Sequence, residues 1–266
     1  MLDGVSRSSL VMAVARAIET ERPDGLFKDP LAAKLAGEDT IAEVRPSVQK
    51  YEDSGAPITI VRTRFFDDFL QSKGDLIRQV VILGAGMDTR AFRLSWHSDT
   101  HLFEIDSPEV IEYKESVLGS TPSHCYRHTI AIDLKELTAD LLIVQGYRMD
   151  IPTIWLMEGS IYYLDESEVH RLLKTITELS ASGSWLGVDF INSFFIGKNM
   201  GDLSQYWKYG CDEPEKLLSV YNWSASVVQA SDEGANYGRF TYKLPARDIQ
   251  DAPHYFFTQA IYKPPK

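Results

Sequence analysis

The sequence predicts an α/β fold built on a doubly wound sheet of seven strands, most of them parallel. From residue 79 onward, short apolar stretches alternate with helical ones, which is the pattern of βαβ units. The expected strands are apolar throughout, as strands buried on both faces are. Two late segments, 238–244 and 254–263, alternate apolar and polar residues as antiparallel strands do. We therefore expect a Rossmann-like sheet with an antiparallel C-terminal addition, preceded by N-terminal helices.

The N-terminal region is expected to be helical. Residues 8–21 have apolar side chains at helical spacing, 29–37 predict a short helix, and 56–73 predict a long one. On this basis residues 1–75 form a helical cap that contributes to the ligand site, and residues 76–266 form the sheet core.

The core elements follow in order along the chain. The five expected parallel strands are 79–84, 101–106, 128–133, 153–159 and 184–191. Ser107 and Pro108 are the preferred N-cap and first residue of a helix over 107–118. Asp165 and Glu168 form a capping-box pattern at the start of a helix over 164–180. The aromatic stretch at about 192–222 has no clear period, so we interpret it as an insertion or a lid.

Composition excludes several classes of protein. The 266 residues carry a net charge of −11, with 27 Lys and Arg against 38 Asp and Glu. Binding a phosphate backbone needs clustered basic residues, so no nucleic-acid partner is expected. Cys125 and Cys211 lack metal-binding spacing and are expected to be reduced. The sequence has no signal-peptide pattern and no apolar run of membrane-spanning length, so we expect a cytoplasmic protein with no membrane partner.

The segment QVVILGAGMDTRAFRL, residues 79–94, joins an apolar strand to a glycine turn. Gly84 and Gly86 allow the backbone to turn sharply and to approach a ligand closely. A tight strand-to-helix turn without any ligand would use the same residues. The residues that follow the neighbouring strands distinguish between these two interpretations.

Acidic residues follow four consecutive strand regions of the predicted sheet. Doubly wound sheets bind ligands at the edge where these strand ends meet, and buried carboxylates are costly unless they are paired. Solvated loop acids would explain one or two of them, whereas four on one edge indicate a ligand site. These acids are Asp88, Glu104 with Asp106, Asp133 and Glu158.

The same acids indicate which ligand the site holds. A carboxylate after the second strand can accept both hydroxyls of a ribose, and Asp133 could accept from an adenine amino group while Leu134 packs on the ring. A dinucleotide site needs a third glycine, where this sequence has Thr89. S-adenosylmethionine suits the acids through its sulfonium and ammonium, and one arginine, Arg62 or Arg64, can hold its carboxylate bidentately.

The combined motifs resemble those of a known family. VVILGAGMDTRAFRL, FEIDSPEVIEYKESVL, AIDL and LMEGSIYYL are similar to motifs of the leucine carboxyl methyltransferase family. This family belongs to the class I S-adenosylmethionine-dependent O-methyltransferases, and its bacterial members methylate carboxyl or hydroxyl groups of natural products. The resemblance runs from about Ser6 to Trp223. It implies a class I methyltransferase core over residues 76–266.

The resemblance also implies a role for each cofactor-binding residue. Glu104 is a second candidate for the ribose, although it could instead pair with a basic residue. Arg64 is the alternative to Arg62, and Arg16 is a further candidate for the carboxylate. The implied set is Arg62 for the methionyl carboxylate, Gly84, Ala85 and Gly86 for the methionine and ribose, Asp106 for the ribose hydroxyls, Asp133 and Leu134 for the adenine, and Glu158 for the methionyl ammonium.

The acceptor is expected to be a small molecule, such as a polyketide or a modified peptide, with no metal involved. A carboxylate acceptor is ionised at neutral pH and needs no base, whereas a hydroxyl needs one, most often histidine. His254 is the candidate base, with a packed or exposed histidine as its alternative. The candidate acceptor-binding residues are Tyr162, Tyr163 and Tyr206. A protein C-terminal carboxylate as acceptor and an NAD(P)-dependent oxidoreductase are the alternative functions, and the oligomeric state stays open.

Overall fold

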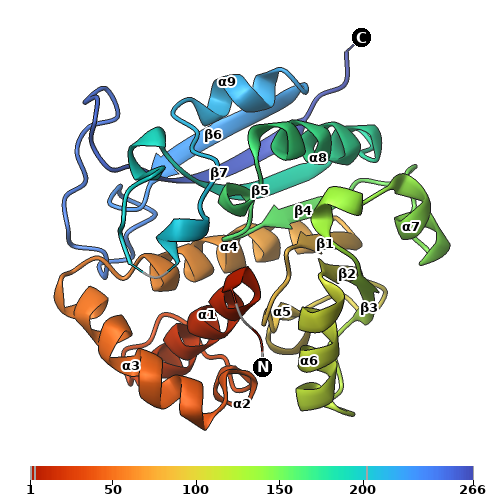
Figure 1. Ribbon diagram of the computed structural model, residues 1–266. Coiled ribbons are helices and arrows are strands. Elements are labelled where there is room, and N and C mark those ends of the chain that lie inside the picture. The colour runs from red at the N-terminus through yellow and green to blue at the C-terminus, as the bar shows by residue number, and fades with distance from the viewer. Residues whose placement is uncertain (1, 3, 202, 266) are drawn as a thin grey trace.

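The computed structural model describes residues 2, 4–201 and 203–265, and its centre is one seven-stranded sheet in the order β3-β2-β1-β4-β5-β7-β6 (Figure 1). Strands β1 to β5 are parallel to one another, and β7 lies between β5 and β6 and is antiparallel to both. The predicted fold class is therefore confirmed. The strands are β1 Gln79–Leu83, β2 His101–Asp106, β3 Tyr126–Ala131, β4 Ile154–Met157, β5 Trp185–Ile191, β6 Trp223–Gln229 and β7 Tyr255–Tyr262.

Helices cover both faces of the sheet. In Figure 1, α1, α2 and α3 lie together on one side of the molecule, and α8 and α9 lie on the opposite side. The N-terminal helices are α1 Gly4–Glu21, α2 Ala32–Ala36, α3 Glu38–Asp53 and α4 Ile58–Gly74. The helices of the core are α5 Arg90–Arg93, α6 Pro108–Leu118, α7 Ala139–Val144, α8 Glu166–Glu178 and α9 Pro214–Ser219. Among the described helices, none is both long and apolar enough to cross a membrane.

The alternating side chains of β1 explain why its residues from Val80 to Leu83 are all apolar. Val80 and Ile82 belong to the hydrophobic cluster that includes α1 and α4, whereas Val81 and Leu83 belong to the cluster that includes α8. Successive strand residues point to opposite faces, so a strand covered on both sides needs apolar residues at every position. All five residues of β1 are buried.

The helix boundaries follow local capping chemistry. Asp165 accepts a hydrogen bond from the Glu168 N–H, and the Glu168 side chain accepts from the Asp165 N–H, so the predicted capping box begins α8. Ser107 occupies the N-cap of α6 with Pro108 directly after it, as predicted, but its hydroxyl makes no capping bond.

The prediction of a strand at 238–244 was wrong. Arg239 from this segment pairs with Glu19 and Glu52, and the Thr241 and Tyr242 N–H groups donate to the Gly55 carbonyl. These contacts hold the segment against the N-terminal helices and away from the sheet. The edge strand beside β7 is β6, for which the sequence predicted no strand.

Candidate active site

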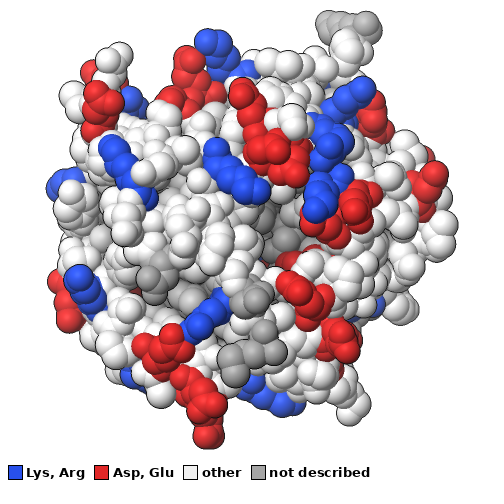
Figure 2. All heavy atoms as spheres, in the orientation of Figure 1, with Lys and Arg blue, Asp and Glu red and all other residues white. Residues whose placement is uncertain are grey.

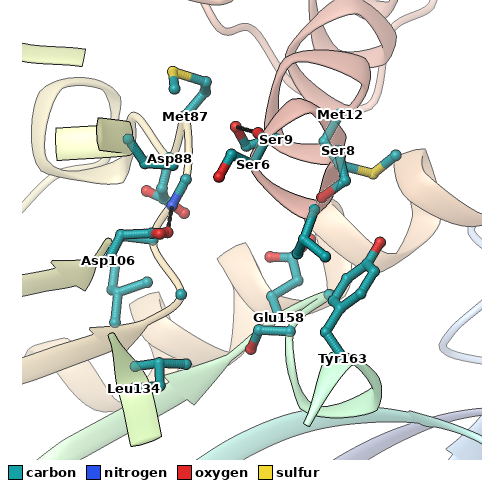
Figure 3. A pocket seen from close by; sticks show the side chains of 18 of the residues that line it. Ser6, Ser8, Ser9, Met12, Met87, Asp88, Asp106, Leu134, Glu158 and Tyr163 are labelled. Carbon is teal, nitrogen blue, oxygen red and sulfur yellow. Dashed lines mark hydrogen bonds between the residues drawn. The ribbon is translucent and has the colours of Figure 1, made fainter. Parts of the chain in front are cut away.

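A cavity of about 390 Å³ lies at the carboxyl ends of β1, β2, β3 and β4, and residues of α1 and α4 close it from the other side. Four of the predicted acids line it together. They are Asp88, Asp106, Asp133 and Glu158. Figure 3 shows Asp106 and Glu158 on opposite walls, with Ser6 and Ser9 of α1 toward the glycine loop and Met12 on the side of Glu158 and Tyr163. The edge of the sheet at which the sequence predicted a ligand site thus contains a cavity.

The glycine loop needs its glycines for two separate reasons. Gly84 and Gly86 have φ values of +70° and +46°, in the left-handed region that favours glycine. A Cβ at Gly84 would lie 2.7 Å from the Ser160 Cβ, and one at Gly86 would lie 2.7 Å from the Ser9 Cβ. The loop therefore forms a cradle in which the backbone, including Ala85, faces the cavity.

Asp106 fixes the cradle from the end of β2. Its carboxylate accepts hydrogen bonds from the Gly86 N–H at 2.6 Å and the Ser107 N–H at 2.7 Å. Burial raises the pKa of Asp106 above its usual value in spite of these two donors. Each carboxylate oxygen can accept more than one hydrogen bond, so Asp106 can still receive a donor from the cavity.

The third strand contributes the next part of the cavity wall. Asp133 accepts a hydrogen bond from the Lys135 N–H at 3.1 Å, and its carboxylate lies 3.0 Å from the Lys135 ammonium. Leu134 lines the cavity between them. A flat apolar group could therefore pack on Leu134 with Asp133 at its edge.

Glu158, at the end of β4, is held by two arginines. Its carboxylate lies 3.2 Å from Arg62 Nε and 2.6 Å from Arg90 Nη2. Burial opposes its ionisation, but Arg90 and Arg62 outweigh burial and hold the pKa of Glu158 below its usual value. The carboxylate therefore stays ionised at the cavity wall.

The structure places Arg62 in the cavity and Arg64 outside it. Arg62 is 6% exposed and lies 2.9 Å from Asp189, and its Nη1 donates to the Tyr162 hydroxyl at 3.1 Å. Within the described part of the chain, the hydrogen-bond partner of its Nη2 is the Met12 sulfur, at 3.4 Å. Arg64 instead pairs with Asp68 on the surface of α4. One arm of Arg62 is therefore available to an anion in the cavity.

From the sequence, Arg90 and Asp88 are expected only to fix the loop, and the place of Arg90 at the centre of this charge network was missed. Arg90 lies 2.7 Å from Asp67, 2.5 Å from Asp88 and 2.6 Å from Glu158. Burial disfavours the charge of Asp88, but Arg90, together with Lys114 and Arg93, outweighs burial and lowers the pKa of Asp88 to about 2. The expectation that Asp88 and Arg90 fix the loop is in keeping with this geometry. Asp67, an acid within the apolar face of α4, was the signal available in the sequence.

Glu104, the second ribose candidate, lies away from the cavity. It is fully buried and pairs with the Lys114 ammonium at 2.7 Å and with Arg127 at 2.8 Å. The alternative expectation, a pair with a basic residue, describes its contacts. Arg16 does line the cavity, where it donates to the Asp29 carboxylate at 2.8 Å.

Of the three candidate acceptor-binding tyrosines and the candidate base, one residue lines the cavity and three lie elsewhere. Tyr163, from the short turn Ile161–Tyr163, lines the cavity (Figure 3). Tyr162 lies behind it, with its hydroxyl on Arg62, and Tyr206 is not among the lining residues. His254 is 3% exposed, with its ring nitrogens at Gln229 and the Ile249 carbonyl. This environment matches the packed alternative for His254.

Two further residues at the mouth of the cavity were not predicted. The Ser6 hydroxyl at the start of α1 donates to Glu109 at the start of α6. Lys208 comes from the aromatic segment, and its N–H donates to the Tyr162 carbonyl at 2.7 Å. Figure 2 shows basic and acidic side chains interspersed on this face. Within the described parts of the chain, no group of three or more His, Cys, Asp or Glu side chains is placed to hold a metal ion.

Comparisons with known proteins show what this chain is similar to. The family model for leucine carboxyl methyltransferase matches residues 9–177. A protein of Streptomyces coelicolor named "Putative S-adenosyl-L-methionine-dependent methyltransferase" is 38% identical over 260 residues, covering 92% of each chain. A protein of Parafrankia with the same kind of name is 44% identical over 246 residues, covering 86% of this chain and 79% of its own.

Solved structures share the fold. A DUF574 family protein from Streptomyces avermitilis superposes with a TM-score of 0.59 at 13% identity, covering 94% of this chain and 97% of its own. A structure from Thermobifida fusca titled "putative methyltransferase" has a TM-score of 0.58 at 13% identity and covers 98% and 95% of the two chains. At this level of identity the likeness concerns the fold alone.

Proposed function

This chain belongs to the leucine carboxyl methyltransferase family, and we propose that it methylates a carboxylate of a small molecule. As a member of this family it is a methyltransferase that uses S-adenosylmethionine. The oxygen acceptor, its carboxylate nature and the small-molecule class are the parts that we propose. The residues that line the cavity support each of them.

The cavity fits the cofactor in shape and in charge. The backbone cradle of Gly84 and Gly86 leaves no room for a side chain, which suits close approach of a ligand. In the proposed arrangement, Asp106 accepts from the ribose and Leu134 with Asp133 frames the adenine. Glu158 faces the methionyl ammonium, and the available arm of Arg62 donates to the methionyl carboxylate. The N-terminal cap, residues 1–75, thus contributes Arg62 to the site.

One observation favours a carboxylate over a hydroxyl acceptor: no histidine is among the described residues that line the cavity. The lining carboxylates already accept hydrogen bonds or form ion pairs, so none is a base without a partner. Their donors come from arginines, Lys135, Ser6 and backbone N–H groups, and the carboxylates are Asp88, Asp106, Glu109, Asp133, Glu158 and Glu168. A hydroxyl acceptor needs a base for its proton, and an ionised carboxylate does not.

The reaction then balances without a proton transfer. When bound, S-adenosylmethionine supplies a methyl group activated by its sulfonium. A carboxylate oxygen of the acceptor forms a bond to the methyl carbon while the carbon–sulfur bond breaks and its electron pair stays on sulfur. The products are a methyl ester and S-adenosylhomocysteine. The protein's contribution is alignment and exclusion of water, and alignment alone can lower the barrier by roughly 7–11 kcal/mol.

Calorimetry and a product assay test this proposal. We expect micromolar binding of S-adenosylmethionine and S-adenosylhomocysteine, and no binding of NAD or NADP. With tritiated S-adenosylmethionine and a panel of organic acids, we expect products that release labelled methanol in mild base, which is diagnostic of methyl esters. Base-stable methylated products, such as ethers, would contradict the carboxylate assignment. Binding of a dinucleotide would contradict the cofactor assignment.

A further inference from the structure

The cavity contains six basic side chains, and five of them are already paired. Arg16 pairs with Asp29, and Lys135 pairs with Asp133. The remaining three are the arginines of the network around Glu158. The six basic residues that line the cavity are Arg16, Arg62, Arg90, Arg93, Lys135 and Lys208. These pairs neutralise charges that belong to the protein itself, so they do not compensate the charge of an incoming acid.

Lys208 is the exception. Within the parts of the chain that the structure describes, its ammonium has no carboxylate within 4 Å. Lys208 is the last and smallest of the causes that lower the pKa of Asp165, and the Glu168 N–H is the first. Asp165 is itself engaged at the start of α8, where it accepts from the Glu168 N–H and the Ser167 hydroxyl. Among the described residues, Lys208 therefore has no dedicated carboxylate partner.

The backbone around Lys208 is fixed even though the side chain is free. The Lys208 and Tyr209 N–H groups both donate to the Tyr162 carbonyl, at 2.7 and 3.3 Å. The Trp207 ring packs edge-on against Tyr162, with ring centroids 5.6 Å apart. This anchoring ties Lys208 to the turn that carries Tyr163, the aromatic residue at the cavity wall. Lys208, an exposed residue, thus lines the cavity from a fixed backbone position.

We propose that Lys208 is the specificity-determining residue that binds the anionic group of the acceptor, so that the enzyme selects organic acids over neutral molecules of the same shape. This inference rests on the proposed carboxyl methylation. Methylation removes the acceptor's negative charge, so the ester product loses its attraction to Lys208. The same contact that favours binding of the acid therefore favours release of the ester.

The test compares acids with their neutral counterparts. The probes are straight-chain and aryl-substituted monocarboxylic acids of four to twelve carbons, each with its primary amide and its alcohol. The acid that the wild-type protein methylates fastest is then measured with Lys208→Ala, Lys208→Glu, Lys208→Arg and a control, Lys174→Ala. Lys174 lies on the exposed face of α8 and pairs only with Glu178, so the control removes one positive charge away from the cavity.

We expect the KM for the acid to rise about tenfold in Lys208→Ala and further in Lys208→Glu, with the KM for S-adenosylmethionine and kcat within about twofold. Lys208→Arg should restore most of the affinity, and Lys174→Ala should match the wild-type protein. An unchanged KM for the acid in Lys208→Glu overturns the inference. So does methylation of the alcohols and none of the acids.

A binding measurement covers the case in which no probe is turned over. With S-adenosylhomocysteine present, calorimetry should detect tighter binding of acids than of their amides, and Lys208→Glu should abolish this preference. Equal binding of acids and amides contradicts the role of Lys208, while cofactor binding remains intact. Failure to bind S-adenosylmethionine or S-adenosylhomocysteine at all is a different result, because it contradicts the proposed function itself.

Discussion

Individual charged side chains at the cavity have tertiary partners that decide their roles. Arg62 and Arg64 are two residues apart on α4, yet one faces the cavity and the other pairs with Asp68 at the surface. Residues two apart on a helix do not share a face. The sequence identified both as candidates for holding a carboxylate, and only the packing of α4 against β4 and β5 separates them.

This separation predicts different effects of matched substitutions. Arg62→Lys keeps the positive charge but removes the planar fork, so it should weaken S-adenosylmethionine binding at least tenfold. Arg64→Lys should change the dissociation constant less than twofold. Calorimetric titration of both variants checks this, with circular dichroism to confirm that each is folded. The reverse ranking would assign the clamp to Arg64.

Asp106 gives a second prediction for a single residue. Asparagine has one acceptor oxygen, so Asp106→Asn cannot accept from both the Gly86 and Ser107 N–H groups and from a ribose. We expect S-adenosylmethionine binding to weaken about 10–100-fold, the range for losing a charged hydrogen-bond partner. Asp150→Asn, which removes an exposed acid paired with Arg148, serves as the control. An unchanged dissociation constant for Asp106→Asn would exclude it as the ribose ligand.

Sequence reasoning found the acids at the ends of the strands but not their partners. The positions of these acids follow from where each strand ends along the chain, and the apolar pattern of the sequence predicts those strand ends. Arg90 and Asp189, by contrast, meet Glu158 and Arg62 through contacts between residues far apart in the chain. Asp189 lies within the apolar strand β5, and an acid at such a position is a signal that it pairs with a buried base.

At the scale of elements, the contact between α1 and the glycine loop determines whether the cavity forms. Gly86→Ala would combine a strained positive φ with a clash against the Ser9 Cβ. Gly119→Ala is a matched control, because Gly119 has φ +57° and nothing within 4 Å of an added Cβ. We expect Gly119→Ala to cost about 1 kcal/mol of stability. Gly86→Ala should cost more and should also weaken S-adenosylmethionine binding by at least tenfold.

Thermal unfolding and calorimetry measure these two effects separately. The double variant Ser9→Gly with Gly86→Ala relieves the clash but leaves the backbone strain, so it should recover part of the lost affinity. If Gly86→Ala and Gly119→Ala have the same stability and the same affinity for S-adenosylmethionine, α1 can move away from the added Cβ at little cost. The close approach of α1 would then have no effect on the cofactor site.

Most elements were predictable because their patterns are local, and the exceptions have identifiable causes. Helix α3 was not predicted: it buries only Val44 and contains Pro46, so it has a weak apolar face. Strand β6 lies at the sheet edge, where several of its residues are exposed. Segment 238–244 alternates like a strand, yet its partners are ions and carbonyls of the N-terminal region. The periodicity of apolar residues predicts which side chains are buried, but it does not predict which segment the backbone forms hydrogen bonds with.

For the whole molecule, the buried charge network couples stability to pH. The pKa of Asp88 is lowered from 3.8 to about 2, because Arg90, Lys114 and Arg93 together outweigh the effect of burial. A carboxyl with a lowered folded-state pKa stabilises the fold above its unfolded pKa, and this contribution is lost as the pH falls toward 2. The shift corresponds to about 2 kcal/mol at neutral pH, of which about 1 kcal/mol is lost by pH 3. The stability gap between the wild-type protein and Asp88→Asn should therefore narrow by that amount between pH 6 and pH 3 in urea unfolding.

Asp189 should show the opposite dependence. Burial raises its pKa above 3.8 in spite of Arg62, so the folded state binds a proton in a pH range where the unfolded chain does not. Lowering the pH through that range stabilises the wild-type protein relative to Asp189→Asn, which widens their stability gap as the gap for Asp88→Asn narrows. Urea unfolding of the wild-type protein and of both variants in the same buffers gives the slope of each stability gap against pH, so that the two slopes can be compared. If both stability gaps change with pH in the same direction, Arg62 keeps Asp189 as firmly ionised as Arg90 keeps Asp88. The whole charge network would then stay ionised throughout this pH range.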